Sequence, residues 1–556
     1  MTKKTKLELT WPGKEDRPAL EPRILIEDSA KSHHAAQRRD GDLFDNMLIK
    51  GDNLLALKAL EQDYAGKVKC VFIDPPYNTG SAFEHYEDGV EHSIWLSLMR
   101  DRLEVIHRLL APDASLWVTL DDNEAHYFKV MCDEVFGRQN FVANVVWQKK
   151  FAPQANVIGI SDSHDHVLVY AKARHTWPAN LLERTAEADA RYKNPDNDPR
   201  GPWMSDNFTI SLTGGARGAQ FAKTGVSSNI YEIETPSGRR LSPSKGRCWG
   251  ASQERFQQLV DENRIWFGED GGNVPRIKRF LSEVQQGVVA RSWWPRDEVG
   301  DNQESKREVA QVNPTDIFGT PKPERLIERI LTIATNQGDL VLDSFAGSGT
   351  TGAVAHKMGR QWIMVEIGNH ADTHIVPRLT KVIDGDDAGG ITKAVSWEGG
   401  GGFRYFTLAP SLLARDRWGN LVISDAYNPE MLAEAMCKHL GFAYAPSQDE
   451  ADWWRHGQSS ETDFLYVTTQ SLTHDALKLL SEAVGPHRTL MICARAFAGA
   501  ADGFANLTCR KIPATILTKC EWGRDDYSLN VGALPERAEA VPDAGPLFAA
   551  GEPDRG

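Results

Sequence analysis

The chain has 556 residues, of which 41% are hydrophobic and 25% charged, a globular composition too long for one simple core, so we expect two to four domains. Its seven cysteines form no CxxC pair and no run of about 18 apolar residues occurs, which argues against a disulfide framework, a cysteine-based zinc site and a membrane span and predicts a cytoplasmic protein. The net charge of −14 excludes a uniformly cationic nucleic-acid binder, although residues 141–320 are almost neutral.

The first predicted elements precede residue 61. Residues 1–40 are polar and weakly patterned, and we interpret them as an irregular N-terminal arm. The stretch NMLIKGDNLLALKAL, residues 46–60, predicts a short strand, a turn at Gly51 and Asp52, and an apolar-periodic helix.

The stretch VKCVFIDPPYNTG, residues 68–80, begins as a buried strand that must end where two prolines remove ladder donors. The turn that follows offers two acceptors, the Asp74 carboxylate and the Pro75 carbonyl, and the flat ring of Tyr77. Such a corner suits a planar group that carries an NH2. A proline-rich turn without chemistry is the alternative interpretation of this stretch alone.

Strands and helices alternate from residue 93 to residue 137, which is typical of βαβ units and a parallel sheet. Asp121 and Asp122 could suggest an acid–base pair, but they precede a helical pattern, so we interpret them as caps.

The regular rhythm is lost between residues 141 and 315, where short aromatic and Gly-rich pieces dominate. One exception is HDHVLVYAK, residues 164–172, a strand compatible with the sheet. The preceding SDSHDH, residues 161–166, could supply metal ligands, but it leads into a strand, so we favour a structural role and predict no metal site. Basic groups at 239–247 and 276–279 fit either a solvated face or a nucleic-acid contact.

The α/β pattern returns with a helix at 322–334 and with DLVLDSFAGSGTTG…VEIG, residues 339–368. Its Gly-rich turn allows close backbone approach to a ligand, and Glu366 ends the next strand where such folds place an acid that binds ribose. A P-loop ATPase is disfavoured because GxxxxGK[ST] does not occur. After this α/β pattern we expect a Gly-rich linker at residues 385–402, a further mixed unit at residues 403–535 and a disordered tail at residues 536–556.

In this order, DPPYNTG, TPKPERLIERIL and DSFAGSGTTG…VEIG resemble the amino-methylating DNA methyltransferases of the β arrangement, above all the Mod subunits of type III restriction–modification systems, over residues 40–380. The resemblance implies an α/β fold, the S-adenosyl-L-methionine (SAM)-dependent methyltransferase fold, with a Rossmann-like mixed sheet and a circularly permuted motif order. It also implies a catalytic domain at residues 41–140 with 316–384 and an inserted target-recognition domain at residues 141–315. A C-terminal α/β domain for dimerisation or docking would follow at residues 403–535.

The same resemblance implies the site. The catalytic tetrapeptide would be Asp74, Pro75, Pro76 and Tyr77. The residues that it places around the cofactor SAM are Asp52, Lys322, Pro323, Asp343, Phe345, Gly347, Gly349, Thr350 and Glu366.

The implied activity is methyl transfer to N6 of an adenine flipped out of duplex DNA, since an acid stands where cytosine-N4 enzymes commonly carry Ser. The implied partners are double-stranded DNA, a second copy of the chain and a separate restriction or helicase subunit, because no helicase or nuclease motif is found. The alternatives are a stand-alone adenine methyltransferase, one that serves another defence system, and an inactive recognition subunit for a partner nuclease. RNA methylation is disfavoured because the large insert suits reading of duplex sequence.

Overall fold

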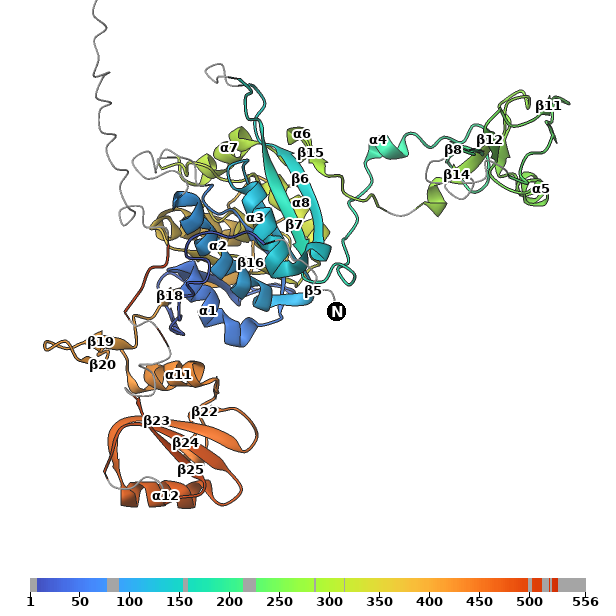
Figure 1. Cartoon of the computed structure of the whole chain (residues 1–556). Coiled ribbons are helices and arrows are strands. Elements are labelled where there is room, and N and C mark those ends of the chain that lie inside the picture. Colours follow the sequence, from blue (N-terminus) through green and yellow to red (C-terminus); the bar gives the residue numbers. More distant parts are fainter. Residues whose placement is uncertain are drawn as a thin grey trace, which may run out of the picture. The chain divides into compact units, whose positions relative to one another are not determined.

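The computed structural model describes residues 8–77, 90–153, 159–213, 227–284, 287–314, 316–498, 503–512, 520 and 523–528. The chain divides into two compact units, one of residues 1–180 with 291–556 and one of residues 181–290 (Figure 1). The expected tail at 536–556 lies outside the described residues. No described helix is both long and apolar enough to cross a bilayer.

The first unit is built on a mixed sheet with the strand order β1-β18-β3-β17-β16-β4-β5-β7-β6-β15, in which β2 also pairs with β18. The central pairs from β18 to β5 are parallel, whereas β7 runs antiparallel to both β5 and β6. The strands are β1 (Leu25–Glu27), β2 (His33–His34), β3 (Asn46–Lys50), β4 (Val68–Ile73), β5 (Leu110–Leu120), β6 (Phe141–Gln148), β7 (His164–Ala171), β15 (Trp293–Trp294), β16 (Leu340–Asp343), β17 (Gln361–Glu366) and β18 (Gly402–Leu408). The sheet confirms the predicted α/β class.

Helices cover both faces of this sheet because alternate residues of each buried strand point to opposite sides. On β4, Val71 and Ile73 belong to the core that α1, α2 and α3 share, while α8 packs on β4 and β5, and α9 on β16 and β17. The helices of this part are α1 (Asn53–Tyr64), α2 (Val90–Leu109), α3 (Ala125–Cys132), α6 (Arg296–Val299), α7 (Asn302–Val312), α8 (Glu324–Ala334), α9 (Thr350–Lys357) and α10 (Val376–Asp384).

The sheet reaches further along the chain than the sequence pattern predicts. Strands β6, β7 and β15 all lie within the stretch expected as an insert, residues 141–315, yet they form one edge of the sheet, and the separate unit spans only 181–290. Strand β7 is the strand expected at residues 164–172, whereas β15 has only two residues and β6 (FVANVVWQ) does not alternate, so their pattern does not distinguish them from irregular chain.

The predicted N-terminal arm and the Gly-rich linker are also parts of the first unit. Strands β1 and β2, which lie within residues 1–40, pair with β18. Within residues 385–402, Ile391 is buried and donates its N–H to Glu324, and the Trp397 indole donates to the Val382 carbonyl. The glycines at 399–401 have positive φ, so this stretch is a packed connection to β18 rather than a free linker.

The unit of residues 181–290 has a small aromatic core that contains Trp249, Phe256 and Phe267. Lys278 is fully buried between Asp196 and Asp198, so one member of the basic group 276–279 has a structural role. Its elements are α4 (Ala186–Asp189), β8 (Trp203–Asn207), β9 (Thr209–Ser211), β10 (Ile233–Glu234), β11 (Arg240–Leu241), β12 (Arg247–Trp249), α5 (Gln253–Asp261), β13 (Ile265–Trp266) and β14 (Arg276–Phe280).

After β18 the chain forms a second sheet of order β21-β22-β23-β24-β25, in which the last three strands are parallel. This agrees with the mixed unit expected beyond residue 403, except that β18 still belongs to the large sheet. The elements are β19 (Leu413–Arg415), β20 (Leu421–Ile423), α11 (Pro429–Leu440), β21 (Ala443–Tyr444), β22 (Gly457–Gln458), β23 (Asp463–Thr473), α12 (His474–Val484), β24 (Thr489–Ala498) and β25 (Leu507–Lys511).

Candidate active site

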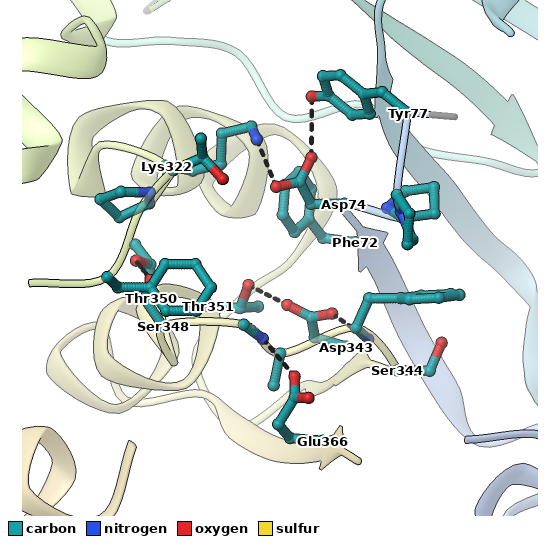
Figure 2. A pocket seen from close by; sticks show the side chains of 18 of the residues that line it. Phe72, Asp74, Tyr77, Lys322, Asp343, Ser344, Ser348, Thr350, Thr351 and Glu366 are labelled. Carbon is teal, nitrogen blue, oxygen red and sulfur yellow. Dashed lines mark hydrogen bonds and ion pairs between the residues drawn. The ribbon is translucent and has the colours of Figure 1, made fainter. Parts of the chain in front are cut away.

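A cavity of about 690 Å³ opens at the carboxyl ends of β4, β16 and β17. The proline turn after β4 and the Gly-rich turn after β16 both line it, although they are far apart in the sequence (Figure 2). Parallel strands bring their carboxyl ends to one edge, which is why these two motifs meet. Most of the predicted residues line this cavity: Asp74, Pro75, Pro76, Tyr77, Lys322, Asp343, Phe345, Gly347, Thr350 and Glu366.

Asp74 is the centre of a hydrogen-bond network at the top of β4 (Figure 2). Its Oδ1 accepts from the Tyr77 hydroxyl at 2.9 Å and from the Thr119 hydroxyl at 2.6 Å, and its Oδ2 is bound by the Lys322 ammonium. The Trp95 indole donates to the Pro76 carbonyl at 2.7 Å, which fixes the turn from the side of α2. The carboxylate is therefore held in one orientation, with a cation beside it.

A second acid, Asp165 of β7, faces the same cavity. Its Oδ2 lies 3.3 Å from the Tyr77 hydroxyl, and its Oδ1 lies 2.6 Å from the Lys149 ammonium, which also contacts Asp162 at 2.6 Å. Burial raises the pKa of Asp165, and burial together with the two neighbouring acids raises the pKa of Tyr77 well above its usual value. Tyr77 is thus a neutral donor between two acids.

Asp343 ends β16 beneath the Gly-rich turn and is almost fully buried. Its Oδ1 accepts from the Phe345 N–H at 2.9 Å and its Oδ2 from the Thr351 hydroxyl at 2.5 Å. Burial raises the pKa of Asp343 to about 7 despite these donors. These two hydrogen bonds fix the backbone of the Gly-rich turn, so Asp343 stabilises the conformation of the turn.

The two glycines of the turn have different surroundings. Gly347 has φ of 54°, lines the cavity, and would place an added Cβ 3.4 Å from the Phe318 ring. Gly349 has φ of 75°, precedes α9 and would place a Cβ 2.9 Å from Ile375, away from the cavity lining. Both positions require glycine, the first to leave room for a ligand and the second to let α9 pack.

Glu366 ends β17 and lines the cavity with little exposure, 8%. Its Oε2 accepts from the Gly347 N–H and its Oε1 from the Gly368 N–H, each at 2.8 Å, and His370 contacts Oε1. The acid is therefore tied to the Gly-rich turn that it faces.

Three predicted cofactor residues lie outside the cavity lining: Gly349, Pro323 and Asp52. Pro323 begins α8. Asp52 is buried and caps α1 through Oδ1, while its Oδ2 contacts Arg102 and accepts from the Tyr527 N–H at 2.9 Å. Both of its oxygens are used inside the protein, and the neighbouring Asn53 lines the cavity instead.

The cavity fits a cofactor with one charged polar end and one flat ring. Ser344 has a buried hydroxyl with no hydrogen-bond partner among the described residues, and it lies in the cavity wall. Phe345 and Phe318 supply apolar ring surface, and Glu366 supplies an acceptor for ribose hydroxyls. The donors and acceptors present therefore suit SAM.

The sequence pattern missed part of the wall, namely Lys149, Asp162 and Asp165, as well as Thr119 beside it. Their place depends on the antiparallel β5–β7 pair, in which Thr119 lies opposite Val167. The alternation of HDH in residues 164–166 was the available signal, because it puts Asp165 on the opposite face of β7 from its neighbours.

Residues 68–376 match the protein family described as DNA methylase (N6_N4_Mtase). The match covers more than half of the chain, and the chain belongs to this family. The resemblance drawn from the motifs and the methyltransferase fold class are confirmed at this level.

Similar proteins include the probable type III restriction-modification enzyme HindVI Mod subunit of Haemophilus influenzae, 31% identical over 74% of this chain and 60% of that protein. The StyLTI Mod subunit of Salmonella typhimurium is 32% identical over 55% of this chain and 49% of that protein. The present chain thus spans about half to three-fifths of these two relatives. Among solved structures, the cytosine-N4-specific PvuII DNA methyltransferase is similar with a TM-score of 0.34 at 14% identity, over 65% of this chain and 93% of that one.

Proposed function

We propose that this protein transfers the methyl group of SAM to N6 of an adenine flipped out of duplex DNA, as the modification subunit of a type III-like restriction–modification system. The observation that carries the proposal is the meeting of Asp74 and Tyr77 with the Gly-rich turn and Glu366 in one cavity. Family membership and the similarity to Mod subunits support it.

The exocyclic NH2 of adenine is a poor nucleophile because its lone pair is delocalised into the ring. Asp74 and the Pro75 carbonyl can accept its two N–H groups and shift the nitrogen towards sp³ geometry, while the Tyr77 ring stacks on the base. SAM supplies an electrophilic methyl group on a sulfonium. The protein contributes positioning in a partly enclosed cavity and needs no covalent intermediate.

Lys322 is the cation that pairs with Asp74 in this site. Its ammonium contacts Asp74 Oδ2 and lies 5.2 Å above the Tyr77 ring. In the proposed reaction, an adenine NH2 that donates to Asp74 would share this carboxylate with Lys322.

The unit of residues 181–290 is the proposed reader of DNA sequence, within the wider insert expected from the sequence pattern. Its exposed Arg239, Arg240 and Lys245 are suited to phosphate contacts. A homodimer, a separate restriction or helicase subunit and residence with DNA in the cytoplasm complete the proposal. The relatives named as Mod subunits support the separate restriction subunit.

Transfer of labelled methyl from SAM to duplex DNA tests the activity, with digestion and mass spectrometry of the product. We expect N6-methyladenine from the wild type and none from Asp74→Asn, whose shape is nearly unchanged but whose amide donates towards the incoming NH2. SAM binding by calorimetry should persist in this variant. N4-methylcytosine, methylated RNA alone, or full activity of Asp74→Asn would contradict the proposal, and loss of transfer by the wild type would favour a recognition subunit without activity.

A further inference from the structure

Four polar side chains, Asp122, His126, His164 and His166, gather where β5 ends and β7 begins, away from the cavity. Asp121 and Asp165 line the cavity, whereas the neighbouring Asp122, His164 and His166 do not. In the antiparallel register Leu120 lies opposite His166, so Asp122 continues along the face that carries the two histidines.

The ligand atoms of Asp122, His164 and His166 all lie within 4.8 Å of one another. Asp122 Oδ1 is 2.8 Å from His166 Nε2 and 3.9 Å from Nε2 of His126, which lies in the first turn of α3. We infer that Asp122, His164 and His166, with His126 as a fourth ligand, bind one divalent transition-metal ion of the zinc class.

The chemistry of these groups suits such an ion. Imidazole nitrogens with one carboxylate oxygen are typical ligands of zinc, and four of them suffice for its tetrahedral coordination. A solvated His–Asp pair without metal is the simpler alternative, and the test below separates the two.

The surroundings also orient His166 and leave a path by which an ion can enter. Asn144 lies within 3.2 Å of His166 Nδ1, and its amide oxygen can accept the Nδ1–H, which leaves the Nε2 lone pair for a metal. His166 is largely buried, with a side-chain exposure of 10%, while Asp122 is 66% exposed. An ion can therefore reach the cluster from solvent and bind against a fixed wall.

Bound metal would tie the start of β7 to the segment after β5. Asp165 stands between the two histidines and faces the Tyr77 hydroxyl, so the site would fix the strand that carries this acid. The inference does not depend on the proposed methylation, because metal binding is measured directly.

Zinc chloride titrated into the chelator-treated full-length protein by calorimetry is the first measurement. We expect one ion per chain, with an affinity at least about tenfold lower in Asp122→Asn and in His166→Ala. His175→Ala, an exposed histidine of the same unit outside the cluster, should bind as the wild type does. Asp122→Asn changes an exposed side chain, so its circular dichroism and melting temperature without metal should match the wild type.

The visible absorption spectrum with cobalt chloride in place of zinc reports which atoms bind the ion. We expect the visible absorption of a four-coordinate ion with nitrogen and oxygen ligands, lost in His166→Ala. A thiolate charge-transfer band would place the metal at cysteines and overturn the inference. Equal zinc affinity in wild type, Asp122→Asn and His166→Ala, or no binding by the wild type, would do the same.

Discussion

At the scale of single residues, Tyr77 has two separable properties, a ring and a hydroxyl. The hydroxyl is one of three donors to Asp74, beside Thr119 and Lys322. We expect Tyr77→Phe to lower kcat/KM, with a loss of transition-state stabilisation of no more than about 1.5 kcal/mol, since two donors to Asp74 remain. Tyr77→Ala also removes base stacking, worth about 1–3 kcal/mol more.

Thr119→Val is the matched variant for this comparison, because it removes another hydroxyl from the same carboxylate oxygen. Steady-state methylation of a duplex and SAM calorimetry would be measured on all three variants. If Tyr77→Phe is as inactive as Tyr77→Ala while Thr119→Val is active, the Tyr77 hydroxyl has a direct catalytic role that we do not assign to it.

Asp343 gives a prediction about pH. Its pKa is about 7 in the folded protein and lies near the ordinary Asp value when unfolded, so between about pH 4 and pH 7 the folded state holds a proton that the unfolded state releases. Stability from this group therefore falls as pH rises through that window. Asp343→Asn keeps an acceptor for the Phe345 N–H and should remove this pH dependence.

Melting temperatures of the wild type and Asp343→Asn between pH 4.5 and pH 7 would check this prediction. The advantage of wild type over Asp343→Asn should shrink as pH rises from 4.5 towards 7, by the linkage argument above. Asp386→Asn, at an exposed position, should run parallel to the wild type. An advantage that grows with pH would mean that Asp343 is ionised in the fold.

At the scale of elements, α9 begins at a glycine with left-handed backbone. Gly349→Ala combines an unfavourable φ of 75° with a Cβ 2.9 Å from Ile375, whereas Gly338→Ala has φ of 82° and open space. The conformational cost alone is about 1–2 kcal/mol in free energy of unfolding, which Gly338→Ala should show. Gly349→Ala should exceed it and lower the melting temperature further.

Gly347→Ala completes this set. Its φ is also positive, but its Cβ points to Phe318 across the cavity, so SAM affinity should fall more than stability does. Calorimetry with SAM and thermal unfolding of the three variants would be compared. Unchanged SAM affinity in Gly347→Ala would contradict the assignment of the turn to the cofactor.

Two short motifs made much of the site predictable from sequence, since DPPY and the Gly-rich turn each carry their geometry within a few residues. The part that could not be predicted depends on pairing between distant strands. Asp165 meets Tyr77, and Lys149 meets Asp165, only because β7 runs antiparallel beside β5 and β6. Asp52 shows the opposite case, because its motif matched the family while capping and the contact with Tyr527 engage its oxygens.

At the scale of the whole molecule, the unit of residues 181–290 can be exchanged without cutting the large sheet. Replacement of that segment by its counterpart from a similar enzyme should change the methylated sequence and leave the product as N6-methyladenine. Sequencing of methylated DNA would report both. A chimaera that folds and methylates the original sequence would contradict the assignment and direct attention to residues beyond 403.

The lysines of the unit of residues 181–290 give a prediction about DNA binding and stability. Lys245→Ala should weaken DNA binding uniformly across sequences and lower the salt slope by about 0.9 if Lys245 contacts one phosphate. Lys393→Ala, an exposed lysine of the first unit, is the control. Lys278→Ala should instead destabilise the unit, because Lys278 is buried between two acids.

The pairing of β3 with β18 joins Asn46 to Phe403, and the contact of Asp52 with Tyr527 joins positions still further apart. When the proline turn after β4 has been synthesised, β16, β17 and β18 have not yet been made. The described strands of the unit of residues 181–290, β8 to β14, pair with one another, so their pairing needs no strand that is made later. During synthesis the proposed DNA reader is therefore made before the strands that complete the cavity, and the proposed activity has to wait for β16, β17 and β18.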